Sequence, residues 1–129
     1  MDEKDMLAGT AEAAVTQAKR LGAQLAEAYL SSTKELNIDV REGRVETMKV
    51  ARDRGMGLRV TAGKKPGFAF TSDLSREVVE ETVRRAVANA RNTDDDPFRV
   101  FPVPPPGYPN LDLFDPEISG ASIEEKIKL

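Results

Sequence analysis

The first regular pattern along the chain is helical. Apolar residues recur at intervals of three and four between residues 4 and 21, at Leu7, Ala11, Ala14, Ala18 and Leu21. Gly22 follows the last of them, at the place where helices commonly end in a left-handed residue. The pattern predicts an amphipathic helix over 4–21, whose narrow, alanine-rich stripe can lie close against a sheet.

Between residues 25 and 71 the period changes to two, as in half-buried strands. Leu36, Ile38 and Val40 alternate with polar residues, and so do Leu58 and Val60. Turn-forming sequences interrupt the alternation at Glu42-Gly43, Asp53-Arg54-Gly55 and Gly63-Lys64-Lys65-Pro66-Gly67. We therefore expect four antiparallel strands joined as a meander, since the connections are too short for crossover helices; the strands are 25–41, 44–53, 56–62 and 67–71.

A second helix is predicted over 75–92. Ser75 stands at the N-cap position, and one apolar face is made by Val79, Val83, Ala86, Val87 and Ala90. Each helix has one apolar stripe and the strands have one alternating face, so two packed layers satisfy all of them. The expected fold is α+β in the order αββββα, with both helices on one face of a four-stranded sheet and Phe68 and Phe70 packed under a helix.

The composition changes after the second helix. Asp94-Asp95-Asp96 is followed by seven of the chain's eight prolines, between Pro97 and Pro116, which favours extended backbone. Ser122 and Glu125 then form a capping-box pattern. We expect a domain over 1–95, a proline-rich acidic linker or strap over 96–120, and over 121–129 the start of a clipped helix that leads to an absent C-terminal domain.

Composition removes several classes of chemistry. The 129 residues include no His, Cys or Trp, so zinc sites of imidazole or thiolate, Ser-His-Asp and Cys-His nucleophiles and disulfide scaffolds are excluded. No apolar run approaches the length of a membrane span, and Met1-Asp2-Glu3-Lys4-Asp5 is too polar for a secretory signal. These features predict a cytoplasmic protein with no membrane partner.

Several short motifs approach a known chemistry without matching it. The segment 65–70 is similar to an RNA-binding RNP1 strand, but Pro66 replaces its basic residue. The segment 57–65 is similar to a phosphate-binding loop, with five intervening residues instead of four. The hairpin 41–65 has eight basic and three acidic residues, as a surface that follows a phosphate backbone would, although solvated strands collect the same residues. None of the three defines a site.

A family resemblance rests on several segments in combination. Their order resembles the N-terminal domain of the TldD/PmbA family over residues 5–96. The matching segments are Gly22-Ala23 with Ala26-Glu27, Val40-Arg41-Glu42-Gly43-Arg44-Val45-Glu46, Arg54-Gly55-Met56-Gly57-Leu58-Arg59-Val60, Gly67-Phe68-Ala69-Phe70-Thr71-Ser72-Asp73-Leu74-Ser75, and Ala86-Val87-Ala88-Asn89-Ala90-Arg91. The tail segment Leu111-Asp112-Leu113-Phe114-Asp115-Pro116 resembles the family's exit from this domain and slightly favours the PmbA (TldE) type.

The resemblance implies a role in cytoplasmic proteolysis and peptide maturation, in a family named for modulation of DNA gyrase. Its TldD-type subunits are zinc metalloproteases with a His-Glu-x-x-x-His helix in a larger C-terminal part, and PmbA-type partners lack that motif. Because this chain has no histidine, we expect no catalytic, metal-binding or cofactor-binding residue in it. Zinc is expected only in the absent C-terminal part of a TldD-type subunit.

The expected function is that of a non-catalytic domain that helps to enclose the substrate passage and contacts a second subunit. Its expected partners are a TldD/PmbA-type subunit, in a homo- or heterodimer, and an unfolded peptide; which residues contact substrate is not assigned. Two alternatives stay open. One is a small nucleic-acid-binding module that uses the basic hairpin 41–65, a less favoured partner because exposed aromatic residues are not interleaved with the bases. The other is a non-enzymatic adaptor.

Overall fold

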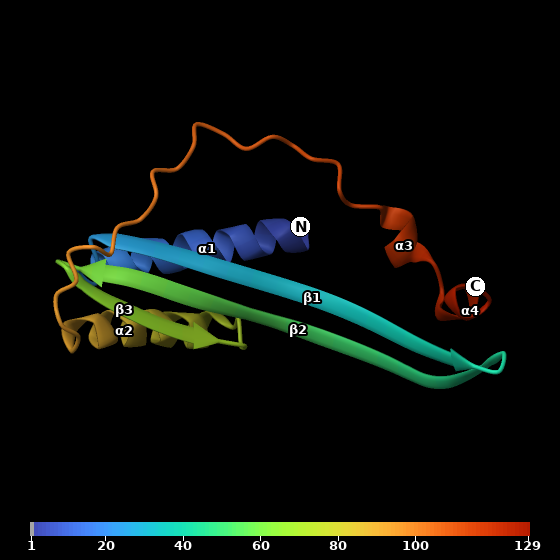
Figure 1. The fold of residues 1–129 in the computed structure, drawn as a ribbon. Helices are drawn as coiled ribbons and strands as arrows, with labels where there is room; N and C mark the ends of the chain where they lie inside the picture. The colour runs from blue at the N-terminus through green and yellow to red at the C-terminus, as the bar shows by residue number, and fades with distance from the viewer. Residues whose placement is uncertain (1) are drawn as a thin grey trace. The chain divides into compact units, whose positions relative to one another are not determined.

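The computed structural model describes residues 2–129. Figure 1 shows the elements in chain order, which are α1 (Glu3–Arg20), β1 (Leu25–Arg41), β2 (Arg44–Ala62), β3 (Lys65–Thr71), α2 (Arg76–Arg91), α3 (Pro116–Gly120) and α4 (Ile123–Ile127). The strands form one sheet in the order β1-β2-β3. The α+β class and both long helices are confirmed, but the prediction of four strands is wrong because the described sheet has three.

The difference in strand count comes from a turn that does not form. The sequence pattern predicts a break at Asp53-Arg54-Gly55, whereas β2 runs through this segment from Arg44 to Ala62. Gly55 lies within the strand, and a Cβ there would be 3.0 Å from the carbonyl oxygen of Thr71. The glycine therefore permits a close approach of β2 to the end of β3, which is the other common reason for a glycine in a strand.

The predicted turn at Glu42-Gly43 is confirmed, whereas the one predicted over 63–67 is shorter, because β3 begins at Lys65 and not at Gly67. Glu42 and Gly43 join β1 to β2, with φ values of 52° and 73°. Positive φ at both residues of a two-residue loop is the geometry of a type I′ hairpin turn. Gly63, with φ of 67°, begins the turn into β3. β2 and β3 then pair antiparallel from Ala62 opposite Lys65 to Met56 opposite Thr71.

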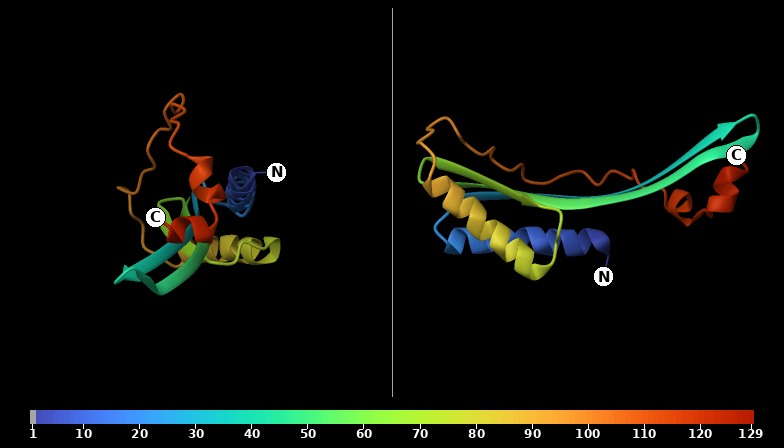
Figure 2. Two further views of the ribbon diagram at one scale, coloured as in Figure 1. Left: turned by 90° about the vertical axis from the view of Figure 1, so that its right-hand side faces the viewer. Right: turned by 90° about the horizontal axis from the view of Figure 1, so that it is seen from below.

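The core lies between the sheet and the two long helices, which cover the same face of the sheet (Figure 2). All five residues of the apolar face predicted for the second helix are buried. They pack with Ala14 and Ala18 of α1 and with Met56, Leu58 and Val60 of β2. The two-layer arrangement predicted from the apolar stripes is confirmed.

Helix α2 lies unusually close to β3, and this reverses the predicted orientation of that strand. A Cβ on Gly67 would be 2.3 Å from the Ala86 carbonyl oxygen and 2.6 Å from the Ala90 Cβ. Only small side chains fit under the helix, so Gly67 and Ala69 are buried there. Phe68 and Phe70 point to the opposite face and are 55% and 71% exposed. The prediction that they pack under a helix is wrong.

The end of α1 and the start of α2 lie where the sequence predicts them, but the hydrogen bond at the start of α2 differs from the expected one. Gly22, with φ of 106°, follows the last residues of α1 as predicted. Ser75 occupies the N-cap position of α2, but its side chain makes no capping hydrogen bond. The Ser75 backbone N–H instead donates to Asp73 Oδ1 over 2.8 Å, which fixes the approach to the helix.

Contacts divide the chain into two compact units. The first, which contains the core, comprises the residues up to Lys34 together with Ala51–Phe101. The second comprises Glu35–Val50, which is the distal part of the β1–β2 hairpin, and Pro102–Leu129. Within the second unit, α4 begins with the predicted capping box between Ser122 and Glu125, and α3 is a short helix that the sequence pattern does not predict.

Candidate functional site

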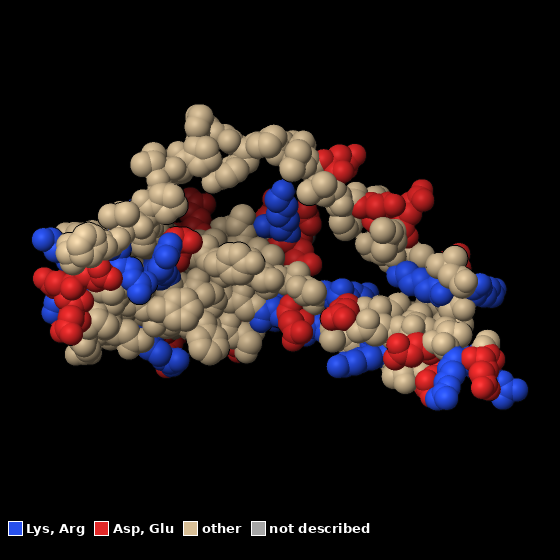
Figure 3. Space-filling model, in the orientation of Figure 1, with Lys and Arg blue, Asp and Glu red and all other residues tan. Residues whose placement is uncertain are grey.

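The main candidate surface is the face of the sheet opposite the helices, within the first unit. We call it the open face, and its residues are Glu27, Tyr29, Gly57, Arg59, Phe68 and Phe70. Figure 3 looks onto this face and shows an uncharged area over β2 and β3. Tyr29 is 73% exposed, comparable to the two phenylalanines. Large apolar side chains exposed together on a sheet are typical of a surface that contacts another molecule.

The two phenylalanine rings of the open face pack against each other and against the sheet. The Phe68 and Phe70 ring centroids are 6.4 Å apart with an interplanar angle of 27°. Phe68 lies over Gly57 of the neighbouring strand, where a Cβ would be 3.3 Å from Phe68 Cε2. This packing of ring against glycine holds Phe68 across β2 and leaves one side of the ring exposed.

The charged groups of the open face neutralise each other. Arg59 of β2 is hydrogen bonded and ion paired to Glu27 of β1, and both side chains are partly exposed. The Arg59 guanidinium also lies 4.6 Å from the centroid of the Phe101 ring, a cation–π contact. The segment after α2 therefore covers one part of the face. The remainder presents rings without an excess of charge, which suits an apolar or peptide partner better than a phosphate backbone.

The backbone at the sheet edges is a second binding feature. β1 is an end strand, so one side of it has no neighbouring strand in the described sheet. On the other side of the sheet, the ladder between β2 and β3 starts at Met56 and leaves 51–55 of β2 without a β3 partner. Free N–H and C=O groups of this kind can pair with an extended peptide.

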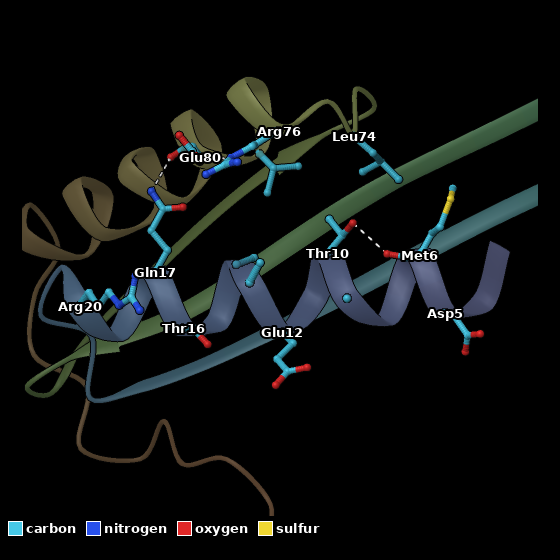
Figure 4. Close-up of a pocket in the computed structure, with 14 residues that line it drawn as sticks. Asp5, Met6, Thr10, Glu12, Thr16, Gln17, Arg20, Leu74, Arg76 and Glu80 are labelled. Atoms are coloured by element: carbon cyan, nitrogen blue, oxygen red, sulfur yellow. Dashed lines mark hydrogen bonds and ion pairs between the residues drawn. The ribbon is translucent and has the colours of Figure 1, made fainter. Parts of the chain in front are cut away.

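The first unit also has two hollows. A groove of about 1070 Å³ lies between α1 and α2, where Gln17 Nε2 donates to the Glu80 carbonyl oxygen over 3.2 Å (Figure 4). A smaller hollow of about 350 Å³ lies beside the start of α1. We call it the basic hollow, and it is lined by Glu3, Ser32, Thr33, Lys34, Arg52, Asp53 and Arg54.

The acidic side chains of the described residues do not gather into a metal site. Over residues 2–129, no group of three or more His, Cys, Asp or Glu side chains is placed to hold a metal ion. The Asp94–Asp96 run forms no such group, and Asp96 is paired with Arg99 at 3.3 Å. The carboxyl groups of Asp73 and Glu125 have pKa values lowered mainly by backbone hydrogen bonds from Ser75 and Ser122. Both acids belong to helix starts, so these shifts reflect local structure.

The structure separates the residues of the predicted basic hairpin 41–65. Arg41 pairs with Glu46 at 3.5 Å in the second unit, and Arg59 pairs with Glu27 on the open face. Arg52 and Arg54 line the basic hollow. The segment 57–65 that is similar to a phosphate-binding loop forms the end of β2 and the turn to β3 and precedes no helix. Within the first unit, Arg59 thus lies on the open face, and Arg52 and Arg54 lie in the basic hollow.

The aromatic part of the open face is what sequence reasoning missed. The signal is present in the sequence, because Gly67 and Ala69 alternate with Phe68 and Phe70. Either the small pair or the phenylalanine pair must face α2. The prediction places the phenylalanines there, but α2 lies too close to β3 to leave room for them. A second indication is Ala86 with Ala90 on α2, small residues that permit close packing on a strand.

None of the helices over residues 2–129 combines the length and the apolar composition that crossing a membrane requires.

Comparison with known proteins identifies the family. The model of the family described as PmbA/TldA metallopeptidase domain 1 matches residues 26–90. Metalloprotease PmbA of Escherichia coli O157:H7 is 31% identical over 112 residues, which cover 81% of this chain and 23% of that protein. A metalloprotease PmbA homolog of Haemophilus influenzae is 32% identical over 83 residues, covering 64% of this chain and 18% of that protein. The chain thus spans about a quarter or less of these relatives.

Solved structures show the same fold. A protein from Bacteroides thetaiotaomicron described as a modulator of DNA gyrase superposes with a TM-score of 0.82 at 22% identity, over 98% of this chain and 29% of that one. TldE from Thermococcus kodakarensis gives a TM-score of 0.76 at 17% identity, over 92% of this chain and 28% of that one. Together with the family match over 26–90, these comparisons establish that the chain belongs to the PmbA/TldD metallopeptidase family, of which it contains domain 1.

Proposed function

We propose that this chain is the peptide-enclosing and subunit-contacting domain of a PmbA/TldE-type subunit in a zinc metalloprotease system. The observation that carries the proposal is the open face, with three exposed aromatic rings in a sheet that also has free strand edges. The relatives that name a type, PmbA and TldE, support the assignment of type. The cytoplasmic location expected from the sequence remains a prediction.

The residues of this chain do not fit the metal of the family. A catalytic zinc site takes three protein ligands, most often histidine with carboxylate or cysteine. The chain has no His or Cys, and its described carboxylates form no cluster of three. Under the proposal, the bond cleavage occurs on polypeptide outside these residues, and this domain contributes binding alone.

The free strand edges support a role in holding unfolded peptide. A peptide that adds to an edge satisfies its backbone groups with backbone groups of the sheet, and this is independent of its sequence. The outer side of β1 offers such an edge in the first unit, as does 51–55 of β2. A folded protein cannot supply an extended strand as readily, so this mode of binding selects for unfolded chains.

The open face supports contact with a second TldD/PmbA-type subunit. Phe68, Phe70 and Tyr29 are exposed aromatic groups, a residue class that is enriched in protein interfaces. Without a partner on the open face, all three rings would be exposed to water. Covering them with an apolar surface of a partner subunit releases that water and stabilises the assembly.

The subunit contact is tested with the double variant Phe68→Ser/Phe70→Ser in the complete subunit. We expect its affinity for the TldD/PmbA-type partner to fall by at least about tenfold, since two interface aromatic residues are lost. The matched control is Phe98→Ser, which removes a ring that is 89% exposed outside the open face. Equal affinity of the double variant and the wild-type protein, measured by analytical ultracentrifugation, would refute the contact.

One observation favours nucleic acid as the alternative partner. Exposed, stacked Phe68 and Phe70 resemble base-stacking rings of RNA-binding sheets more than a buried pair would. The neutralised Arg59 opposes this reading. A nucleic-acid binder loses about one log unit of affinity per log unit of salt for each phosphate contacted, and a titration at two salt concentrations distinguishes the two partners.

A further inference from the structure

The basic hollow contains three cationic side chains without an ion pair among the described residues. Lys34 comes from β1, and Arg52 and Arg54 come from β2. Within residues 2–129, the ion pairs of the first unit involve other arginines, namely Arg59, Arg76, Arg85 and Arg99. Arg52 and Arg54 therefore form no ion pair within the described part of the chain, and although the charge of Arg54 also acts on the Asp73 carboxyl, both guanidinium groups can bind an added anion.

The two acids of the hollow do not neutralise it. Glu3 Oε1 accepts a hydrogen bond from the Ser32 hydroxyl over 2.7 Å, which holds this carboxylate at the edge of the helix start. Asp53 is the other acid in the lining, so three cations face two anions there. With a volume of about 350 Å³, the hollow has room for a carboxylate and several waters, each of which takes about 30 Å³.

The hollow also adjoins a free strand edge. Arg52 and Arg54 belong to 51–55 of β2, the stretch that has no β3 partner. The place beside Gly55 is taken by Thr71 and Ser72, so a peptide that pairs with β2 lies beyond Ser72, next to the stretch that contains both arginines. Backbone pairing would fix the peptide, and the arginines would select one kind of side chain.

We propose that the basic hollow binds the carboxylate of an Asp or Glu side chain on an extended peptide that pairs with 51–55 of β2. This inference rests on the proposed peptide-holding function and adds a preference for acidic unfolded segments. The planar guanidinium matches a carboxylate with two parallel hydrogen bonds, which lysine cannot do alone. The mixed lining, with Glu3 and Asp53, repels the continuous charge of a phosphate backbone more than a single carboxylate.

The experiment compares two unstructured ten-residue peptides that differ only by one central Glu or Gln. Each is labelled with fluorescein and titrated with the 129-residue chain at low salt, with anisotropy as the readout. We expect the Glu peptide to bind about three- to tenfold more tightly, the range of a partly exposed charge-assisted contact. The preference should disappear in Arg52→Gln/Arg54→Gln and persist in the control Arg84→Gln, an exposed arginine of α2.

The outcomes separate this inference from the proposed function. Equal binding of the Glu and Gln peptides by the wild-type chain, or a preference that survives in Arg52→Gln/Arg54→Gln, overturns the hollow and leaves peptide binding intact. If neither peptide binds, the basic hollow and the proposed peptide-holding function are both overturned. Tighter binding of a DNA oligonucleotide that is lost in the same variant overturns the hollow as a peptide site. Both arginines are exposed, and matching circular dichroism spectra verify that the variant is folded.

Discussion

Gly67 determines how the layers of this domain meet. Its missing side chain lets the Ala86 and Ala90 turn of α2 rest directly on β3, and this contact turns Phe68 and Phe70 to the open face. Gly57 then provides the flat surface on which Phe68 lies. A binding surface thus follows from two positions at which a Cβ would collide with a neighbour.

The replacement Gly67→Ala should destabilise the domain by about 1–3 kcal/mol or more, the usual cost of overpacking a core. The Cβ would lie 2.3 Å from a backbone oxygen, so α2 has to move away. The matched control Gly9→Ala adds a methyl group to an open position of α1 and should stabilise by about 0.5–1 kcal/mol. Urea unfolding measures both, and a neutral Gly67→Ala would contradict the close packing.

At Asp73, hydrogen bonds determine the ionisation. The backbone N–H of Ser75 lowers the pKa of the Asp73 carboxyl below its usual 3.8, followed by the Ser75 side chain, with a smaller contribution from the charge of Arg54. A depressed pKa in the folded state stabilises the fold above the unfolded value, and that contribution is lost as the pH falls through the folded value. The fold should therefore weaken below about pH 4.

An NMR titration of the Asp73 carboxyl tests this directly. We expect a midpoint below 3.8, and Asp73→Asn should reduce the acid sensitivity of unfolding. A midpoint at or above the usual value would show that the Ser75 hydrogen bond is absent in solution.

At the scale of elements, the apolar period predicts the helices well and the strand count poorly. The face from Val79 to Ala90 is correct residue by residue because a helix has one continuous stripe to bury. Gly55 leads to a wrong prediction because glycine occurs both in turns and within strands that another backbone approaches closely. Only the partner strand, which ends at Thr71, decides between the two.

Helix α2 provides a test of the two-layer packing. Val83 is fully buried between the layers, so Val83→Asp should cost about 3–5 kcal/mol by placing an unpaired charge there, enough to unfold a marginally stable domain. Arg84→Asp, one residue further and exposed, should retain cooperative thermal unfolding near the wild-type midpoint. If both variants unfolded alike, helix propensity and not packing would explain the loss.

For the whole molecule, the sequence excludes chemistry more readily than it locates binding. The absence of histidine and cysteine is by itself enough to remove the usual zinc ligands. The open face and the basic hollow are not predictable in this way, since each depends on which residues of separate strands face the same side. Arg59 and Glu27, for example, are 32 positions apart and meet only in the sheet.

We propose above all that this chain binds unfolded peptide and leaves its cleavage to other polypeptide. Mass spectrometry and anisotropy on one sample test this directly, with the 129-residue chain, an unfolded peptide and added zinc. We predict saturable binding of a peptide that remains intact after prolonged incubation. Cleavage fragments that increase with the concentration of the chain, or no binding at all, would contradict the claim.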